Sequence, residues 1–378
     1  MKAMLFITAS FCVAICPAQT RPQGPVKETG EINGARFRID IPDKWNGGLI
    51  LWAHGYSPPE TPYHIAGEEG VRNAGAQLIP VLGAMGYALA QSAYSVQGLA
   101  IREGVLETEA LRQYFVRKYG KTYPTIFAGA HGGGLITYAA TEKFPEAYDG
   151  FVAFGGIPLP ELEWVKERMF DMRLLFDYYL PGLPGSVVAF PDDETWASVR
   201  VQAKKLVDEH PERAKDLLRM YNLRNTDELW RCMGLYTSIL KDLNRNRAHG
   251  NAFDNRNTIY RGSSDDAKLN REIPRYKSDP KAVEYMRQWA TRSCQISSPV
   301  LAINSLFDPV VPSQDTHFFD EACNRAGKTD LFVQMWMNMT GESPTPSAGG
   351  FSLIFKMMDE WIRKGKRPAS GELTVGVN

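Results

Sequence analysis

Short runs of hydrophobic residues alternate with longer amphipathic stretches along the first part of the chain. Residues 35–41 alternate apolar and polar, which predicts a half-buried strand, and the continuous apolar run 49–53 predicts a strand buried on both faces. The same patterns predict further strands at 87–91, 125–128 and 151–154, and helices at 75–85, 103–119 and from the glycines after 128 to about 144. Strands that alternate with helices predict parallel pairing through crossover helices, and therefore an α/β doubly wound sheet.

The alternation stops at about residue 158 and resumes after residue 292. The segment 158–292 is rich in Leu, Arg, Lys, Glu and Tyr at helical spacing and has no clear strand pattern, so it predicts a helical insertion. Beyond it the pattern predicts strands at 299–303 and 331–335 and helices at 313–326 and 351–364. We therefore expect a sheet domain in two parts, 19–157 and 293–378, with a helical cap at 158–292.

The N-terminus has the composition of a secretory signal peptide. Lys2 is followed by an apolar stretch at 3–15, too short to span a bilayer, and by small residues up to Ala18. We predict a signal peptide at 1–18, cleaved near Ala18, and a secreted or periplasmic protein. The rest of the chain has no comparable apolar run, so no transmembrane segment is expected.

Three cysteines remain after such a cleavage: Cys232, Cys294 and Cys323. Export would permit one disulfide, but buried free thiols fit the wide spacing equally well, and both alternatives stay open. No CxxC or Cys/His zinc pattern is present in the sequence.

The overall composition excludes several classes of protein. The 43 basic and 43 acidic side chains balance, which argues against a nucleic-acid partner, and the 18 Phe, 16 Tyr and 8 Trp argue against a disordered chain. No GxGxxG loop with an acidic residue after the next strand occurs, so we expect no organic cofactor.

The most informative motif lies between the strand expected at 125–128 and the following helix. It reads Gly129-Ala130-His131-Gly132-Gly133, the G-x-nucleophile-x-G pattern of a nucleophile elbow. In such a strained turn, Cβ atoms two positions before and after the central residue would clash, and Gly129 and Gly133 avoid this clash. The Gly132 N–H is then placed to bind an oxyanion. The central residue, however, is His131 rather than Ser, Cys or Asp.

Two further loops belong to the same pattern. His54-Gly55-Tyr56 follows the strand expected at 49–53, and the Tyr56 N–H is the second candidate oxyanion donor. Asp308 follows the strand expected at 299–303, where the acid of a nucleophile–acid–histidine triad would lie, although an Asp before Pro also suits a local turn. The loop after the strand expected at 331–335 should carry the histidine, but none of the six histidines is there.

These segments resemble the α/β-hydrolase superfamily, in particular secreted bacterial members with a helical cap. The resemblance covers nearly all of the mature chain and is carried by LILWAHGY, GYALAQSAYS, REGVLETEALRQYFVRKYG, the elbow, FDNRNTIYRGSSDDAKLN and PVLAINSLFDPVVP. It implies an α/β-hydrolase fold, a mostly parallel doubly wound sheet with a helical cap insertion, and an ancestral hydrolysis of esters or amides through an acyl-enzyme. Such relatives read G-H-S-x-G-G at the elbow and V-Q-R…G-H-C near the end. By this comparison His131 stands at the serine position, Glu342 stands at the histidine position, and only Asp308 matches the triad.

Three hypotheses follow from this degenerate triad. In the first, the protein has lost ordinary serine-hydrolase activity and binds a small-molecule ligand in a mostly apolar cleft under the cap. In the second, it is a repurposed hydrolase of an ester or amide substrate, in which His131, Asp308 and Glu342 act in acid–base or nucleophilic roles. In the third, the same three side chains bind a metal ion, with His54 as an additional candidate ligand. The sequence leaves the choice open, and with it whether the protein is an enzyme.

Overall fold

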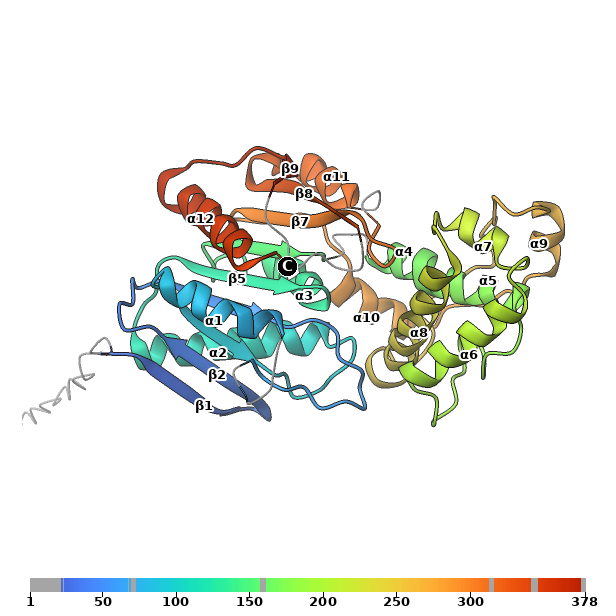
Figure 1. Ribbon diagram of the computed structural model, residues 1–378, viewed down its shortest axis with the longest axis horizontal. Coiled ribbons are helices and arrows are strands. Elements are labelled where there is room, and N and C mark those ends of the chain that lie inside the picture. The colour runs from blue at the N-terminus through green and yellow to red at the C-terminus, as the bar shows by residue number, and fades with distance from the viewer. Residues whose placement is uncertain are drawn as a thin grey trace, which may run out of the picture.

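A nine-stranded sheet with helices beside it forms one part of the molecule, and a lobe of helices lies next to it (Figure 1). The computed structural model describes residues 22, 24–66, 68, 73–156, 161–312, 316–340 and 346–374. The strands are β1 (Val26–Ile32), β2 (Ala35–Ile41), β3 (Leu49–Ala53), β4 (Ala88–Ser92), β5 (Thr125–Ala130), β6 (Gly150–Phe154), β7 (Val300–Phe307), β8 (Phe332–Thr340) and β9 (Gly371–Leu373). They are ordered β1-β2-β4-β3-β5-β6-β7-β8-β9. β1 pairs with β2, and β2 with β4, in antiparallel fashion, and every other pair is parallel. The predicted α/β fold is thus confirmed.

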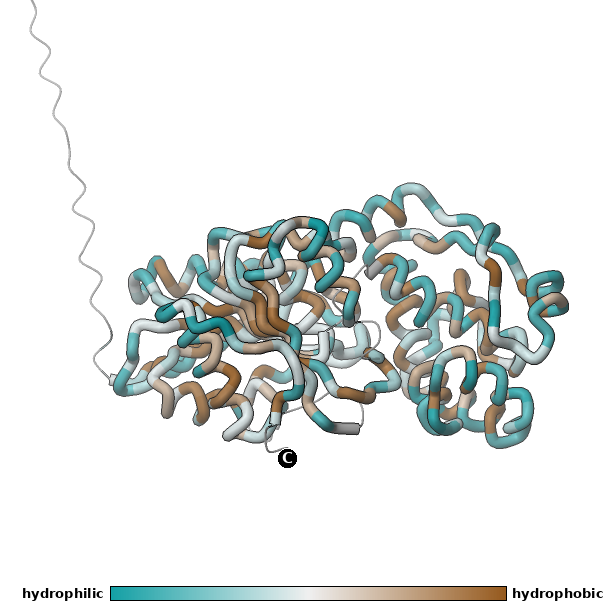
Figure 2. The backbone as a smooth tube through the Cα atoms, turned by 90° about the horizontal axis from the view of Figure 1, so that it is seen from above, coloured by the Kyte–Doolittle hydropathy of each residue, from teal (hydrophilic) through white to brown (hydrophobic). Residues whose placement is uncertain are grey.

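Helices cover both faces of this sheet. They are α1 (Ala74–Ala84), α2 (Ile101–Tyr119), α3 (Gly132–Lys143), α11 (His317–Ala326) and α12 (Ala348–Lys364), with a short 3-10 turn, η4 (Thr329–Leu331), before β8. Along β3, Leu49 and Leu51 belong to the core under α2 and α3, whereas Ile50 and Trp52 belong to the core under α1 and α12. Because both faces are buried, the central strands are continuously hydrophobic, as the hydropathy colouring shows (Figure 2).

The described residues between β6 and β7 form the helical lobe, which we call the cap. They fold into α4 (Glu161–Trp164), the π-helix η1 (Val165–Phe170), α5 (Asp171–Tyr179), α6 (Trp196–Glu209), α7 (Lys215–Met220), α8 (Thr226–Asp242), the π-helix η2 (Leu243–Arg247), α9 (Asp266–Glu272) and α10 (Pro280–Ala290). The only extended pairing among these described residues is an isolated bridge between Ser186 and Ala189. The segment is helical, and its limits as a domain, 158–292, stay a prediction.

Helix α8 fixes the cap over the sheet through polar contacts along its length. The Tyr236 hydroxyl donates to the Val310 carbonyl at 3.1 Å, and the Ser238 hydroxyl lies 2.7 Å from the Tyr56 hydroxyl. At the end of the helix, the buried Asp242 carboxylate accepts a hydrogen bond from the Leu99 N–H at 2.7 Å. α8 therefore spans the carboxyl ends of the central strands, where ligands bind in open α/β sheets.

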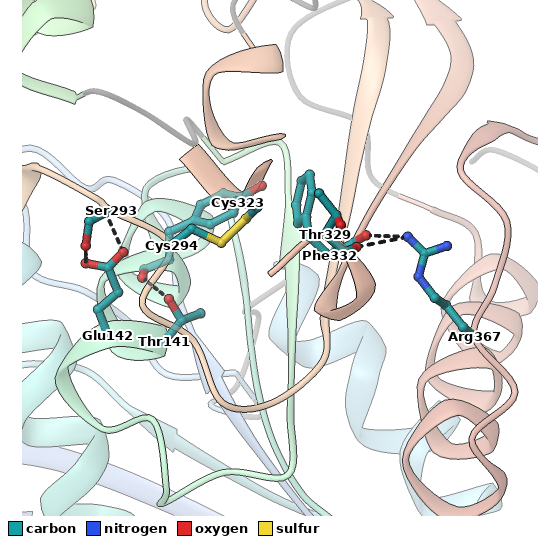
Figure 3. The surroundings of a disulfide bond; sticks show 9 residues. Thr141, Glu142, Ser293, Cys294, Cys323, Thr329, Phe332 and Arg367 are labelled. Atoms are coloured by element: carbon teal, nitrogen blue, oxygen red, sulfur yellow. Dashed lines mark hydrogen bonds between the residues drawn. A yellow bond between two sulfur atoms is a disulfide. The ribbon is translucent and has the colours of Figure 1, made fainter. Parts of the chain in front are cut away.

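A disulfide joins Cys294, which follows α10, to Cys323 in α11 (Figure 3). Beside it, Glu142 at the end of α3 accepts a hydrogen bond from the Ser293 N–H at 2.7 Å. The third cysteine, Cys232 in α8, is buried outside the disulfide, with its Sγ 3.6 Å from the Pro309 carbonyl oxygen. Of the two alternatives left open by the sequence, the structure contains the bridge.

The N-terminal segment 1–18 lies outside the described residues, so the signal peptide stays a prediction. Within the part of the chain that the structure describes, no helix combines the length and the hydrophobicity needed to cross a membrane.

Candidate functional site

The turn between β5 and α3 holds His131 in a backbone conformation that favours glycine. Its φ is 56° and its ψ is −117°, although it carries a large side chain. The turn is fixed by hydrogen bonds, since the His131 N–H donates to the Phe154 carbonyl at 2.8 Å and its own carbonyl accepts from the Gly134 N–H at 3.0 Å. A strained residue of this kind persists only where the surrounding structure imposes it, and such residues cluster at functional sites.

The glycines beside His131 allow three backbone segments to pack directly on one another. A Cβ atom at Gly129 would lie 2.3 Å from the Gly133 carbonyl oxygen, and one at Gly133 would lie 2.0 Å from the Ala53 carbonyl oxygen. Both distances are far below van der Waals contact. The close approach of β3, β5 and α3 therefore requires glycine at both positions.

The two candidate oxyanion donors, Tyr56 and Gly132, lie next to each other. A Cβ atom built on Gly132 would be 2.9 Å from the Tyr56 nitrogen. Among the described residues, neither the Tyr56 N–H nor the Gly132 N–H has a hydrogen-bond acceptor. A ligand atom that accepts hydrogen bonds can therefore pair with both donors.

The imidazole of His131 is neutral and has no hydrogen-bond or ion-pair partner within the described part of the chain. Burial lowers the pKa of His131 to about 4, because the surroundings disfavour the charged ring. The Cδ2 edge of the ring faces Gly55, since a Cβ atom added to that glycine would lie 3.6 Å from Cδ2.

His54 lies close by in very different surroundings. Its ring is stacked between Tyr63 and Tyr94, at centroid distances of 3.5 and 4.1 Å, and its Nδ1–H donates to the Gly55 carbonyl at 2.7 Å. Burial lowers the pKa of His54 to about 4, although the hydrogen bond to Gly55 acts in the opposite direction. These contacts hold the loop after β3 in place.

Both histidines border a cavity of about 340 Å³ between the sheet and the cap, which we call the cap cavity. Its described lining comprises His54, Gly55, Tyr56, Tyr94, Gly98, Leu99, Ala100, Ile101, His131, Gly132, Leu135, Ile136, Gly155, Met169, Trp196, Leu235, Ile239, Val310 and Val311. The described lining includes no acidic side chain, no lysine or arginine, and no serine, threonine or cysteine. The cavity is therefore mostly apolar. Its polar groups are the two imidazoles, the Tyr56 and Gly132 N–H groups, the Tyr56 hydroxyl, and the Tyr94 hydroxyl and Trp196 indole nitrogen, which have no hydrogen-bond partner in the described structure.

Asp308, the predicted acid, follows β7 and is 2% exposed. Its Oδ1 accepts hydrogen bonds from the Val310 N–H at 2.8 Å and the Val311 N–H at 3.0 Å. Asp308 is absent from the described lining of the cap cavity, whereas Val310 and Val311 belong to it. The carboxylate thus stabilises the turn that presents these valines, and a role as triad acid stays a prediction.

Glu342 lies outside the described residues, so its place relative to His131 and Asp308 is untested. The described residues include no group of three or more His, Cys, Asp or Glu side chains that could hold a metal ion. The suggested ligand set contains Glu342, and the metal hypothesis is therefore untested as well.

Sequence reasoning missed the residues with which the cap closes the cavity: Met169 in η1, Trp196 in α6, and Leu235 and Ile239 in α8. Leu235 and Ile239 are four residues apart and so lie on one face of α8. The spacing of Leu235 and Ile239 can be recognised in the sequence. It does not identify a cavity wall, because apolar residues have the same spacing on any helix face that packs against a hydrophobic core.

The strand order, the antiparallel β2 and the elbow after β5 together define an α/β-hydrolase fold. No protein-family model matches the sequence, and no curated protein matches it.

Solved structures of several hydrolases are similar in fold. Candida antarctica lipase A is 12% identical with a TM-score of 0.48, and the match covers 90% of this chain and 77% of the lipase. An epoxide hydrolase from Vigna radiata is 12% identical with a TM-score of 0.44, covering 90% of this chain and 97% of the other. A putative dipeptidyl aminopeptidase IV from Bacteroides ovatus is 13% identical with a TM-score of 0.47, and there the match covers 89% of this chain but only 36% of the peptidase. Since all three TM-scores are below 0.5, the assignment of the fold rests on the topology and elbow of this chain.

Proposed function

We propose that this protein binds a small uncharged molecule in the cap cavity and does not hydrolyse esters through a serine acyl-enzyme. The observation that carries the proposal is the imidazole at the nucleophile position, which is neutral and has no partner in the described structure. A serine triad needs a hydroxyl at this position and a histidine to activate it. The described cavity lining offers no serine, threonine or cysteine to replace that hydroxyl.

His131 is also a weak candidate for a general base. A base is most effective when its pKa lies near the working pH, and burial lowers the pKa of His131 to about 4. At neutral pH the ring would bind a proton poorly, and no described carboxylate stabilises its protonated form. These properties support a binding role over proton transfer.

The cavity itself suggests the kind of ligand. Its apolar walls, formed by residues such as Leu135, Ile136 and Leu235, favour a compact apolar body. The Tyr56 and Gly132 N–H groups favour a hydrogen-bond acceptor such as a carbonyl oxygen.

One observation favours a second candidate, the repurposed hydrolase. The turn keeps a strained conformation, with a φ of 56° at His131, which a purely apolar binding site would not require. In that case the neutral imidazole nitrogen would attack an ester carbonyl carbon, the alcohol would leave, and water would cleave the acyl-imidazole to release the acid. Asp308 and Glu342 would then act as acid–base groups.

A direct test compares ester hydrolysis by the wild type and His131→Ala. Both are assayed with p-nitrophenyl acetate and butyrate at high protein concentration, with His64→Ala as a control for exposed imidazoles, which react non-specifically. We expect equal and near-background rates in all three proteins. Turnover in the wild type and His64→Ala that is lost in His131→Ala would establish the repurposed hydrolase instead.

A constructive test asks whether the scaffold can still support a triad. The double variant His131→Ser with Glu342→His restores both missing groups, whereas His131→Ser alone lacks the base. If the resemblance places Glu342 correctly, we expect esterase activity in the double variant, about a hundredfold or more above the single variant. Equal rates would mean that Glu342 is not at the histidine position.

We further propose that the protein is exported. The signal-like N-terminus and the Cys294–Cys323 disulfide support this, because disulfides persist in oxidising compartments. Fractionation of the native host, with mass spectrometry of the N-terminus, should find the protein outside the cytoplasm and cleaved near Ala18. An intact N-terminus on cytoplasmic protein would contradict the proposal.

A further inference from the structure

In the cap cavity, the Tyr56 and Gly132 N–H groups lie close to the imidazole of His131, whose unprotonated nitrogen can accept a hydrogen bond. From this set we infer that the ligand carries a carboxamide, whose carbonyl oxygen pairs with the Tyr56 and Gly132 N–H groups and whose N–H donates to His131. This inference rests on the proposed binding function and names the chemical class that the cavity selects.

The donors define where the carbonyl oxygen lies. Tyr56 and Gly132 both border the cavity, and their backbones are in contact, as the 2.9 Å distance from a Gly132 Cβ to the Tyr56 nitrogen shows. Neither N–H is used by another described residue. A buried donor without a partner costs about 1–3 kcal/mol, so a ligand oxygen that satisfies both stabilises the complex.

The acceptor lies beside them. A neutral imidazole has one nitrogen with a proton and one without, and no described residue binds either nitrogen of His131. Both tautomers are thus accessible, and a ligand N–H selects the one in which the nitrogen facing it is unprotonated. The side chain of His131 lies against the Gly55–Tyr56 segment, since a Cβ atom added to Gly55 would lie 3.2 Å from the His131 Cβ and 3.6 Å from its Cδ2.

Close relatives of the carboxamide group match this set less well. A ketone or ester offers the carbonyl oxygen but no donor for His131. A carboxylate offers two acceptors and a negative charge, and the described lining has no lysine or arginine to pair with it. Burying an unpaired carboxylate is far more costly than burying a neutral amide.

Three compounds of nearly the same shape test the inference: benzamide, acetophenone and benzoate. Each is small enough for a cavity of about 340 Å³. We would measure their dissociation constants at pH 7 with the full-length mature protein by ligand-observed NMR. We expect benzamide to bind about tenfold more tightly than acetophenone, which corresponds to one additional hydrogen bond, and benzoate to bind most weakly.

Two variants at His131 identify the acceptor. His131→Phe keeps an aromatic ring but removes both nitrogens, so the benzamide-to-acetophenone ratio should fall to about one. His131→Asn keeps a side-chain acceptor in a residue that tolerates positive φ, so part of the preference should remain. Leu235→Trp, which fills the cavity from α8, should weaken the binding of all three compounds, and thermal unfolding would verify that each variant is folded.

The outcomes separate the two proposals. Equal affinity for benzamide and acetophenone in the wild type would overturn the carboxamide inference but leave a binding protein for uncharged ligands. A benzamide preference that persists in His131→Phe would also overturn it, because His131 would not be the acceptor. If none of the compounds binds at millimolar concentration, or if Leu235→Trp leaves their binding unchanged, the cap cavity is not the binding site and both proposals are wrong.

Discussion

His54 and His131 line the same cavity, and burial lowers the pKa of both to about 4, yet their surroundings are opposite. His54 is clamped between the rings of Tyr63 and Tyr94 and donates a hydrogen bond to the Gly55 carbonyl. His131 has no partner in the described structure and occupies a strained turn. A lowered pKa alone therefore does not distinguish a histidine that holds a loop from one that faces a ligand.

The difference concerns which residue stabilises the fold and which is available for chemistry. The contacts of His54 are all internal, so removing its ring should destabilise the protein. The turn at His131 is held by the glycines and by the backbone hydrogen bond to Phe154, without a hydrogen bond from the ring to a described residue. The site thus has the backbone of a nucleophile elbow with an imidazole at the position that the elbow presents.

The largest expected effect is on stability. We expect His54→Ala to lower the free energy of unfolding by about 4 kcal/mol, because it leaves a void between two stacked tyrosines and an unpaired Gly55 carbonyl. His131→Ala should change it by about 1 kcal/mol or less. Urea unfolding followed by tryptophan fluorescence measures both, and similar losses in the two variants would mean that the two rings stabilise the fold equally.

The pH dependence of stability should depend on both buried histidines, because burial lowers the pKa of each to about 4. The pKa of His54 is about 4 in the folded protein and near 6.5 when unfolded, so between these values the unfolded state binds more protons. The free energy of unfolding should therefore fall as the pH is lowered from 7 to 4, with about 3 kcal/mol of the loss due to His54.

His54→Phe tests this, because it keeps the stacked ring but cannot take up a proton. Urea unfolding at pH 7 and pH 4 should give a smaller loss in His54→Phe than in the wild type. His131→Phe should reduce the loss of unfolding free energy by a similar amount, because burial lowers the pKa of His131 to about 4 as well. If His54→Phe loses as much unfolding free energy between pH 7 and pH 4 as the wild type does, the pH dependence comes from other groups.

Much of the fold can be predicted from the sequence, because strands buried on both faces appear there as short continuous runs of apolar residues. The apolar run 49–53 coincides with β3, since a strand covered on both faces has no polar position. β1 and β9 escaped prediction because they are at the edges of the sheet, where VKETGEI is mostly exposed and GEL is only three residues long. Edge strands owe their conformation to a neighbouring strand more than to their own hydrophobicity.

The site was predictable where backbone geometry dictates residue type and unpredictable where it depends on tertiary packing. The glycine spacing around His131 identified the elbow, because no other residue fits at Gly129 or Gly133. The cap side of the cavity did not stand out, because Met169 and Leu235 are ordinary apolar helix residues in the sequence. The pairing of Cys294 with Cys323 likewise depends on a Cα–Cα distance of 4.9 Å that the sequence does not reveal.

Chemical modification should distinguish the two histidines more modestly. Diethyl pyrocarbonate acylates unprotonated, accessible imidazole nitrogens, so at pH 6 we expect His131 to react at least about tenfold faster than His54, which reacts only after local opening. Mass spectrometry of peptides resolves each site, and the exposed His64 serves as the reference for reagent activity. Equal rates at His54 and His131 would mean that the loop after β3 opens as readily as the cavity.

The smallest expected effect concerns the strain at the elbow. His131→Gly removes the side chain from a backbone with a φ of 56° and a ψ of −117°, a conformation that glycine adopts at little cost. We expect the free energy of unfolding to rise by about 1 kcal/mol, whereas His131→Ala, which keeps a Cβ atom, should show no such gain. A gain in His131→Gly that is absent from His131→Ala would show that strain is stored where the elbow presents its side chain. If His131→Gly is no more stable than His131→Ala, the turn is not strained, and the retained geometry no longer favours the repurposed hydrolase over a binding protein.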